Sequence, residues 1–188
     1  MKNSFIIFSL IILLESCTTI DEIIFSAKKA QGYNKKLDNM LIIVDDNEST
    51  PLSNKLGDEI GLALRSVHIP YYIISASFNE NNLDAMTNAA IERRLNYVIY
   101  LKSIIETSEM VLNFYSWQNN WSVIKSRKHQ SIFNITIVDV EYKTVIWKAQ
   151  VVIDGVFKDH LLEEFRHDFL RTLFDYNLLE LLESDLPN

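Results

Sequence analysis

Cysteine, glycine and proline are scarce in this 188-residue sequence. A single cysteine, Cys17, excludes an internal disulfide and any zinc site built from several cysteines. Four glycines and three prolines exclude collagen-like and linker-rich architectures, and leave few places for a glycine-rich phosphate loop. Basic residues are outnumbered by acidic ones, 18 against 25, and this balance argues against a general affinity for nucleic acid. With 48% hydrophobic residues, the chain is apolar enough to form one domain with its own core.

The single cysteine follows an apolar segment near the start of the sequence. This segment, residues 5–14, is too short to span a membrane, which takes about 20 residues. It ends in Leu14-Glu15-Ser16-Cys17, which resembles the lipobox of bacterial lipoproteins: a leucine three residues before the cysteine and a small residue directly before it. Glu15 departs from the family pattern, which usually has a small or hydroxyl-bearing residue there. In that family the signal is removed and the cysteine is diacylated, and two acyl chains are the physical minimum for stable anchoring.

The lipobox resemblance implies a signal peptide over residues 1–16 and a lipid on Cys17, which would attach the protein to a membrane of the bacterial cell envelope. Thr18-Thr19 follow the cysteine, so the aspartate that marks inner-membrane retention in enteric-type sorting is absent. We therefore expect the outer membrane. The sequence leaves open whether the domain faces the periplasm or the cell surface.

The rest of the chain is predicted to form a short tether and one domain. Residues 17–36 are mixed in polarity and are expected to be a lipidated tether, with room for a helical turn around 20–30. Residues 37–188 are expected to form a single α/β domain, because no internal repeat divides them.

Hydrophobic periodicity in the first half of this domain predicts a β-α-β-α-β order. The apolar run at 41–44 is typical of a strand buried on both faces. Thr50-Pro51 then predicts the start of a helix, whose apolar residues recur at helical spacing as far as Val67. A strand over 71–76, a helix over 84–95 and a strand over 97–105 are expected to follow.

The period changes to two in the second half of the domain, which predicts antiparallel strands. Residues 110–117 are expected to pair with the preceding strand through a turn at 106–109, and residues 118–130 to form a polar loop. Strands over 131–140 and 144–153 are expected to form a hairpin, before a final helix over 161–182. Together these elements predict a mixed sheet of about five strands with helices packed against it.

The predicted hairpin carries a second resemblance. Ile135–Val140 followed by Lys143–Ala149 is similar to the "strand, Asp, turn, Thr, strand with Trp" pattern of small α/β lipoproteins. These include relatives of the curli-secretion lipoprotein, the TolB amino-terminal domain and the penicillin-binding-protein activator lipoproteins. The resemblance implies an α/β fold and an envelope-assembly or partner-binding role without catalysis. Physics alone also explains the pattern, since β-branched residues fill strands and Trp147 supplies a large buried anchor.

Leu41–Asp46 also resembles the first strand of a response-regulator receiver domain, in which paired aspartates bind magnesium. Such a site needs hard oxygen ligands, and receivers supply a further carboxylate at the end of the third strand. Here the matching strand is followed by Lys102, so a cation stands where the carboxylate is required. Asp45 and Asp46 are therefore interpreted as polar residues that close a buried strand.

Other catalytic patterns are weak. The sequence contains no G-x-S-x-G elbow, no H-E-x-x-H motif and no phosphate loop. His160, Glu164 and His167 have the spacing of one helix face, but no supporting partners are predicted for a metal, so we interpret them as a solvated face. Gly57 and Gly61 lie on an amphipathic helix, which favours a tight helix–sheet contact over membrane dimerisation. We predict no catalytic residue, no metal and no cofactor.

Aromatic and basic residues are concentrated at 114–128, in a chain that is otherwise acidic. Aromatic side chains beside cations suit anionic or amphiphilic partners: a glycan, lipid head groups or a protein hot spot. The alternative is that the aromatic residues fill the core and the basic residues lie in an ordinary solvated loop. The candidate partner-binding residues are Trp117, Trp121, Lys125, Arg127 and Lys128.

These observations predict a lipid-anchored envelope lipoprotein that acts as a non-catalytic binding or assembly component, with a protein partner in the envelope. Two alternatives stay open. One is a metal-dependent periplasmic enzyme that uses Asp45, Asp46 or the face from His160 to His167. The other is a structural subunit of a multimeric secretion or envelope complex.

Overall fold

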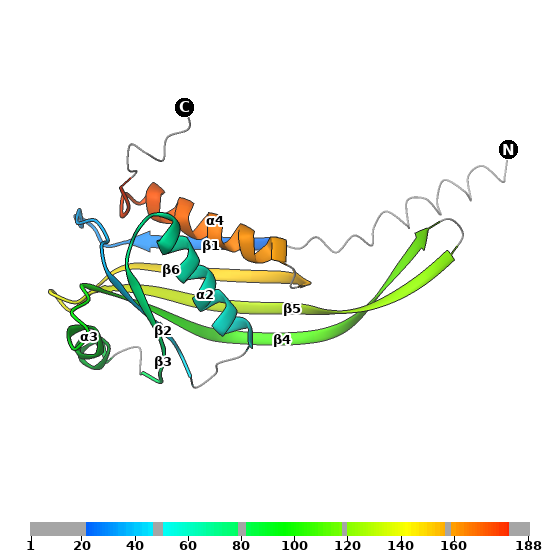
Figure 1. Cartoon of the computed structure of the whole chain (residues 1–188), viewed down its shortest axis with the longest axis horizontal. Helices are drawn as coiled ribbons and strands as arrows, with labels where there is room; N and C mark the ends of the chain where they lie inside the picture. Colours follow the sequence, from blue (N-terminus) through cyan, green and yellow to red (C-terminus); the bar gives the residue numbers. More distant parts are fainter. Residues whose placement is uncertain (1–21, 47–50, 79–81, 118–119, 157–158, 181–188) are drawn as a thin grey trace, which may run out of the picture.

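The chain folds into a six-stranded mixed sheet with helices packed on it, an α/β fold (Figure 1). The computed structural model describes residues 22–46, 51–78, 82–117, 120–156 and 159–180. The strand order across the sheet is β1-β6-β5-β4-β2-β3. Along the chain the elements are β1 (Glu22–Lys29), β2 (Met40–Val44), α2 (Pro51–Ser66), β3 (Tyr71–Ser75), α3 (Leu83–Ile91), β4 (Tyr97–Trp117), β5 (Asn120–Asp139), β6 (Thr144–Val156) and α4 (Asp159–Asp175).

The sheet combines a parallel part and an antiparallel part. Strand β2 runs parallel to both β3 and β4, as the β-α-β-α-β order predicts. The pairs β4–β5, β5–β6 and β6–β1 are antiparallel. The predicted hairpin is confirmed, because Asp139 at the end of β5 lies opposite Thr144 at the start of β6.

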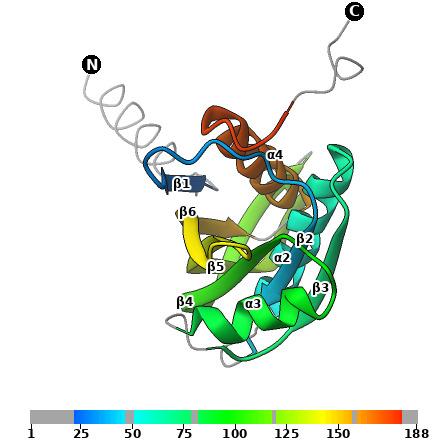
Figure 2. The same cartoon turned by 90° about the vertical axis from the view of Figure 1, so that its left-hand side faces the viewer.

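Helices cover the two faces of the sheet unequally (Figure 2). Helices α2 and α4 pack on one face, over a core that contains Ile99, Phe133 and Trp147. Helix α3 packs on the other face, next to Leu41 and Val98. Trp147 is 1% exposed, and its ring centre lies 6.2 Å from that of Phe169 of α4 in a T-shaped arrangement, so its predicted role as a buried anchor is confirmed.

Helix α2 lies unusually close to the sheet at two glycines. A Cβ atom added to Gly57 would lie 2.6 Å from Cγ2 of Val44, and one added to Gly61 would lie 2.7 Å from the ring of Tyr71. Real Cβ atoms essentially never lie so close to another heavy atom, so a larger residue at either position would force its neighbours to shift. The predicted tight helix–sheet contact is confirmed.

Strand β1 corrects the prediction of a tether over residues 17–36. Glu22–Lys29 pairs along its length with β6 and becomes an edge strand of the sheet, which therefore has six strands instead of about five. Ile23 is buried, and Phe25 and Ala27 on the same side are partly buried beside α4. Their alternation with Ser26 and Lys28 is a strand pattern, and it excludes the helical turn expected here.

Strands β4 and β5 correct the predictions of a turn at 106–109 and a polar loop at 118–130. Strand β4 runs without interruption through the expected turn, and β5 begins at Asn120. The pairing with β5 has a register shift between Ser103 and Ile105 and then continues in regular register through Glu106–Glu109. The polar residues there are compatible with a strand, because a ribbon exposed to solvent tolerates polar side chains.

The last helix ends before the predicted residue 182. Helix α4 stops at Asp175, and Asn177 adopts a left-handed backbone conformation with φ of 56°. The amides of Asn177 and Leu178 donate to the carbonyls of Phe174 and Leu173, a hydrogen-bond pattern that closes helix C-termini. Asparagine tolerates this conformation better than most residues, so Asn177 marks the end of the helix. None of the described helices is long and apolar enough to cross a membrane.

Candidate interaction site

The paired strands β4 and β5 extend beyond the rest of the sheet as a two-stranded arm (Figure 1). Strand β2 pairs with β4 only as far as Leu101, and β6 pairs with β5 only from Lys128 onwards. Within the described strands, Met110–Trp117 and Asn120–Arg127 therefore pair only with each other. We call these two segments the arm.

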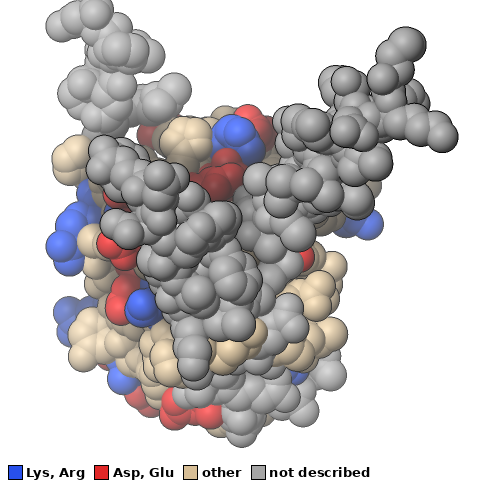
Figure 3. Space-filling view, turned by 90° about the vertical axis from the view of Figure 1, so that its right-hand side faces the viewer, with Lys and Arg blue, Asp and Glu red and all other residues tan. Residues whose placement is uncertain are grey.

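The arm is more hydrophobic than the chain as a whole. Nine of its sixteen residues are hydrophobic, and its two charged residues, Lys125 and Arg127, are both basic. The side chain of Met110, at the base of the arm, is 59% exposed. Basic and acidic side chains are interspersed on the described surface around the end from which the arm projects (Figure 3). The arm thus differs in composition from its surroundings.

The backbone brings the predicted partner-binding residues onto this arm or to its base, in place of the expected loop. Trp121 lies opposite Ser116, Lys125 opposite Leu112 and Arg127 opposite Met110. Trp117 ends β4, and Lys128 pairs with both Glu109 and Val156 where the sheet begins. The side chains of all five predicted residues lie outside the part that the structure describes.

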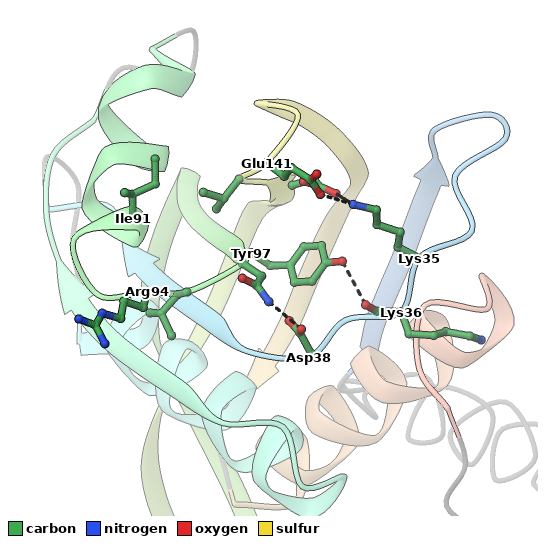
Figure 4. A pocket seen from close by; sticks show the side chains of 11 residues that line it. Lys35, Lys36, Asp38, Ile91, Arg94, Tyr97 and Glu141 are labelled. Carbon is green, nitrogen blue, oxygen red and sulfur yellow. Dashed lines mark hydrogen bonds and ion pairs between the residues drawn. The ribbon is translucent and has the colours of Figure 1, made fainter.

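A pocket of about 650 Å³ lies at the opposite end of the sheet from the arm (Figure 4). Three segments form it: the connection from β1 to β2, the connection from α3 to β4, and the β5–β6 turn. Its walls mix apolar and charged side chains, among them Lys35, Asp38, Ile91, Leu95 and Glu141. No sequence motif indicates this pocket, because its walls come from segments far apart in the chain.

The charged groups of this pocket bond to one another. The buried carboxylate of Asp139 accepts from the Tyr33 hydroxyl at 2.7 Å and from the Tyr142 amide at 3.1 Å. The Tyr97 hydroxyl donates to the Lys36 carbonyl at 3.1 Å, as drawn in Figure 4, and lies 3.1 Å from that of Tyr33. Burial and the bonds to Tyr97 and Asp139 raise the pKa of Tyr33, which holds its hydroxyl in the protonated form. This network ties the β5–β6 turn to the β1–β2 connection.

Lys35 completes the rim of the pocket. Its ammonium lies 2.5 Å from the Glu141 carboxylate, 3.9 Å from that of Asp139 and 4.1 Å from the centre of the Tyr142 ring. The hydrogen bond to Glu141 is the main cause that raises the pKa of Lys35. Because these charges satisfy one another, we interpret the pocket as a structural joint.

The residues considered for metal chemistry do not converge. Asp45 is buried at the end of β2, whereas Asp46 beside it is exposed. His160 and His167 are exposed on α4, where His167 lies 3.8 Å from Asp168. Across the described ranges, no group of three or more His, Cys, Asp or Glu side chains has the geometry to hold a metal ion.

Comparison with known proteins identifies similar folds only. The sequence matches no protein-family profile, and no curated protein matches it. The PelC dodecamer from Paraburkholderia phytofirmans aligns with a TM-score of 0.51 at 12% identity, over 86% of this chain and 100% of that chain. A second PelC dodecamer structure from that organism aligns with a TM-score of 0.47 at 12% identity, over 79% of this chain and 96% of that chain. A PDZ domain protein from Parabacteroides distasonis aligns with a TM-score of 0.41 at 10% identity, over 90% of this chain and 39% of that chain. The first of these shows a shared fold.

Proposed function

We propose that this protein is a lipid-anchored component of the bacterial cell envelope that acts by binding, without catalysis, in an assembly that contains several copies of the chain. The arm is the observation that carries this proposal. Strands β4 and β5 extend beyond every described strand that flanks them.

A two-stranded ribbon has little stability of its own in water, and three or more strands or a packed surface are normally needed. The arm is rich in hydrophobic residues, and Met110 at its base is largely exposed. Natural proteins rarely leave such ribbons bare, because unpaired strand edges recruit other chains. A partner that packs on the arm would supply the missing surface.

The fold comparison supports self-association as the form of that assembly. The solved chain with the similar fold is described as a dodecamer, and it aligns over its whole length. Most soluble oligomers consist of identical subunits, so a second copy of the chain is the simplest candidate partner.

The proposed lipid anchor would hold the domain close to its membrane. Cys17 and the first residue of β1, Glu22, are separated only by residues 18–21. Cys17 and Glu22 are five residue steps apart, which span at most about 18 Å even when fully extended. Strand β1 would therefore lie next to the lipid head groups, without a long flexible tether.

Two measurements test the proposal. The mass of the full-length protein, solubilised from membranes in a mild detergent, should be that of several copies in native mass spectrometry. A single copy at every concentration would contradict self-association. Cys17→Ser should abolish acyl labelling and leave an unprocessed precursor, because the chain has no other thiol. A variant that still matures and is still acylated would refute the anchor.

A further inference from the structure

The described helices cover one face of the sheet only at one end. Helix α3 packs there, over a cluster that includes Val98 of β4, Val138 of β5 and Val145 of β6, and both α2 and α4 lie on the opposite side (Figure 2). Away from that end, none of the described helices packs on this side of β5, β6 and β1. We call this surface the open face.

A row of aliphatic residues crosses the open face at right angles to the strands. Each of its members is paired with the next across neighbouring strands. In order, they are Ile105 of β4, Ile132 of β5, Val152 of β6 and Ile24 of β1. Ile105 is 49% exposed and Ile24 is 48% exposed, and the two central residues are half-buried. The strand register therefore produces a continuous apolar row across four strands, which we call the apolar row.

The two sides of the apolar row carry opposite charge. On one side, Lys28 of β1 lies directly opposite Lys148 of β6. On the other side, Glu22 of β1 lies directly opposite Asp154 of β6. Like charges at directly opposed positions of an antiparallel pair repel each other, so opposite charge brought to either pair by a partner would favour binding. We call them the basic flank and the acidic flank.

From this pattern we propose that the open face binds a second copy of the chain, face to face, about a two-fold axis that lies along the apolar row. This rests on the self-association proposed above and names the surface and the partner. Such an axis places the apolar row of one copy on that of the other, and the basic flank of each copy on the acidic flank of its partner. An axis parallel to the strands would instead bring like charges together.

The shape of the basic flank fits this arrangement. A shallow hollow of about 190 Å³ lies there, lined by Ser26, Lys28, Asn134, Thr136, Lys148, Ala149 and Gln150. It offers space for the carboxylates of the partner's acidic flank. Sheets that pack face to face lie about 10 Å apart with their strands within about 30° of each other, a spacing that side chains of this size fill.

Charge reversal tests the pairing of the flanks in the full-length, detergent-solubilised protein. Lys28→Glu would set like charges against the acidic flank and weaken association by about tenfold or more. Adding Glu22→Lys to that variant exchanges the two charges and should restore association. Lys55 is exposed on α2, on the other side of the sheet. Lys55→Glu changes the charge by the same amount as Lys28→Glu, so it serves as the control and should leave association unaltered. Loss in the first variant without recovery in the second would overturn the charge pairing.

Cross-linking tests the axis. Ile24→Cys should be joined to its own counterpart by a short bismaleimide, because each residue of the apolar row lies beside the axis. Leu62→Cys, on α2 and 38% exposed, should not be joined, and the unmodified chain provides the blank. Dimers through Leu62→Cys alone would place the contact elsewhere.

These outcomes separate the two proposals. A wild-type particle of several copies that is insensitive to Lys28→Glu refutes the open-face contact and leaves self-association intact. A wild-type protein that is monomeric throughout refutes both. A third outcome is that Lys28→Glu binds liposomes more weakly than the wild type while its particle mass is unchanged. That result would assign the basic flank to the membrane surface and overturn the proposal.

Discussion

The same two strands have opposite environments at their two ends. In the body of the sheet, Ile99 and Leu101 of β4 are fully buried between β2 and β5 under helix α2. Further along the same strand, Met110 is 59% exposed, and the arm that follows has no flanking strand among the described residues. Burial is therefore decided by neighbouring elements, since hydrophobic residues occur in both parts. Changes in the body should alter stability, and changes in the arm should alter association.

Replacing Trp147 with alanine tests the body most severely. Removal of a fully buried indole that packs on Phe169 should lower the free energy of unfolding by about 3–5 kcal/mol. Denaturant unfolding of the purified variant measures this change. A loss below about 1 kcal/mol would mean that the hairpin does not bury this ring as described.

Gly57→Ala tests the close contact of α2 with β2. The added methyl group would overlap with the Val44 side chain, so we expect a loss of about 1–3 kcal/mol, partly offset by the better helix propensity of alanine. Thermal unfolding of the purified variant measures this loss of stability. The matched control, Leu62→Ala on the exposed side of the same helix, should be nearly neutral. Equal effects at both positions would contradict the close contact.

Tyr33→Phe tests the joint at the pocket end of the body. Loss of the hydroxyl that donates to Asp139 should reduce stability by about 1 kcal/mol. The pKa of Tyr33 is raised in the folded state, so the wild type should lose stability as the pH rises above about 10, where tyrosines of the unfolded chain ionise. This loss should be smaller in the variant, in unfolding curves recorded from pH 8 to about pH 11. An identical slope would show that Tyr33 is not coupled to folding.

Changes in the arm should have the smallest effect on stability and a clear effect on association. Trp121→Ala should change the free energy of unfolding by less than about 0.5 kcal/mol and still weaken recovery of the partner from solubilised envelopes. Charge reversal at Lys125 and Arg127 should mainly slow association, and the effect should fade with added salt. Intact partner recovery in both variants would assign the arm to ordinary surface.

The sequence predicts well those parts of the fold whose signal is local. The unbroken apolar run Leu41–Val44 forms a strand that is buried along its whole length. The hairpin around residues 141–143 also follows from two adjacent alternating segments. In both cases the residues that define the element lie next to one another in the chain.

The parts that the sequence did not predict depend on distant partners. Strand β1 has a period of two, but its partner β6 lies near the other end of the chain. The bond from Tyr33 to Asp139 joins two segments with no shared motif. Glu106–Glu109 has the composition of a turn and is part of a strand, because the facing residues 128–131 of β5 continue the pairing.

The order in which the strands appear along the chain also constrains how the domain can fold. The first described strand, β1, is an edge strand, and its only described strand partner is the last described strand, β6. Contacts between distant parts of a chain form late, because the closure of a long loop costs entropy. An N-terminal strand held at a membrane by the proposed lipid would thus have to wait for synthesis and export of the rest of the chain. Under that proposal the sheet would close, as its final step, at the strand that is exported first.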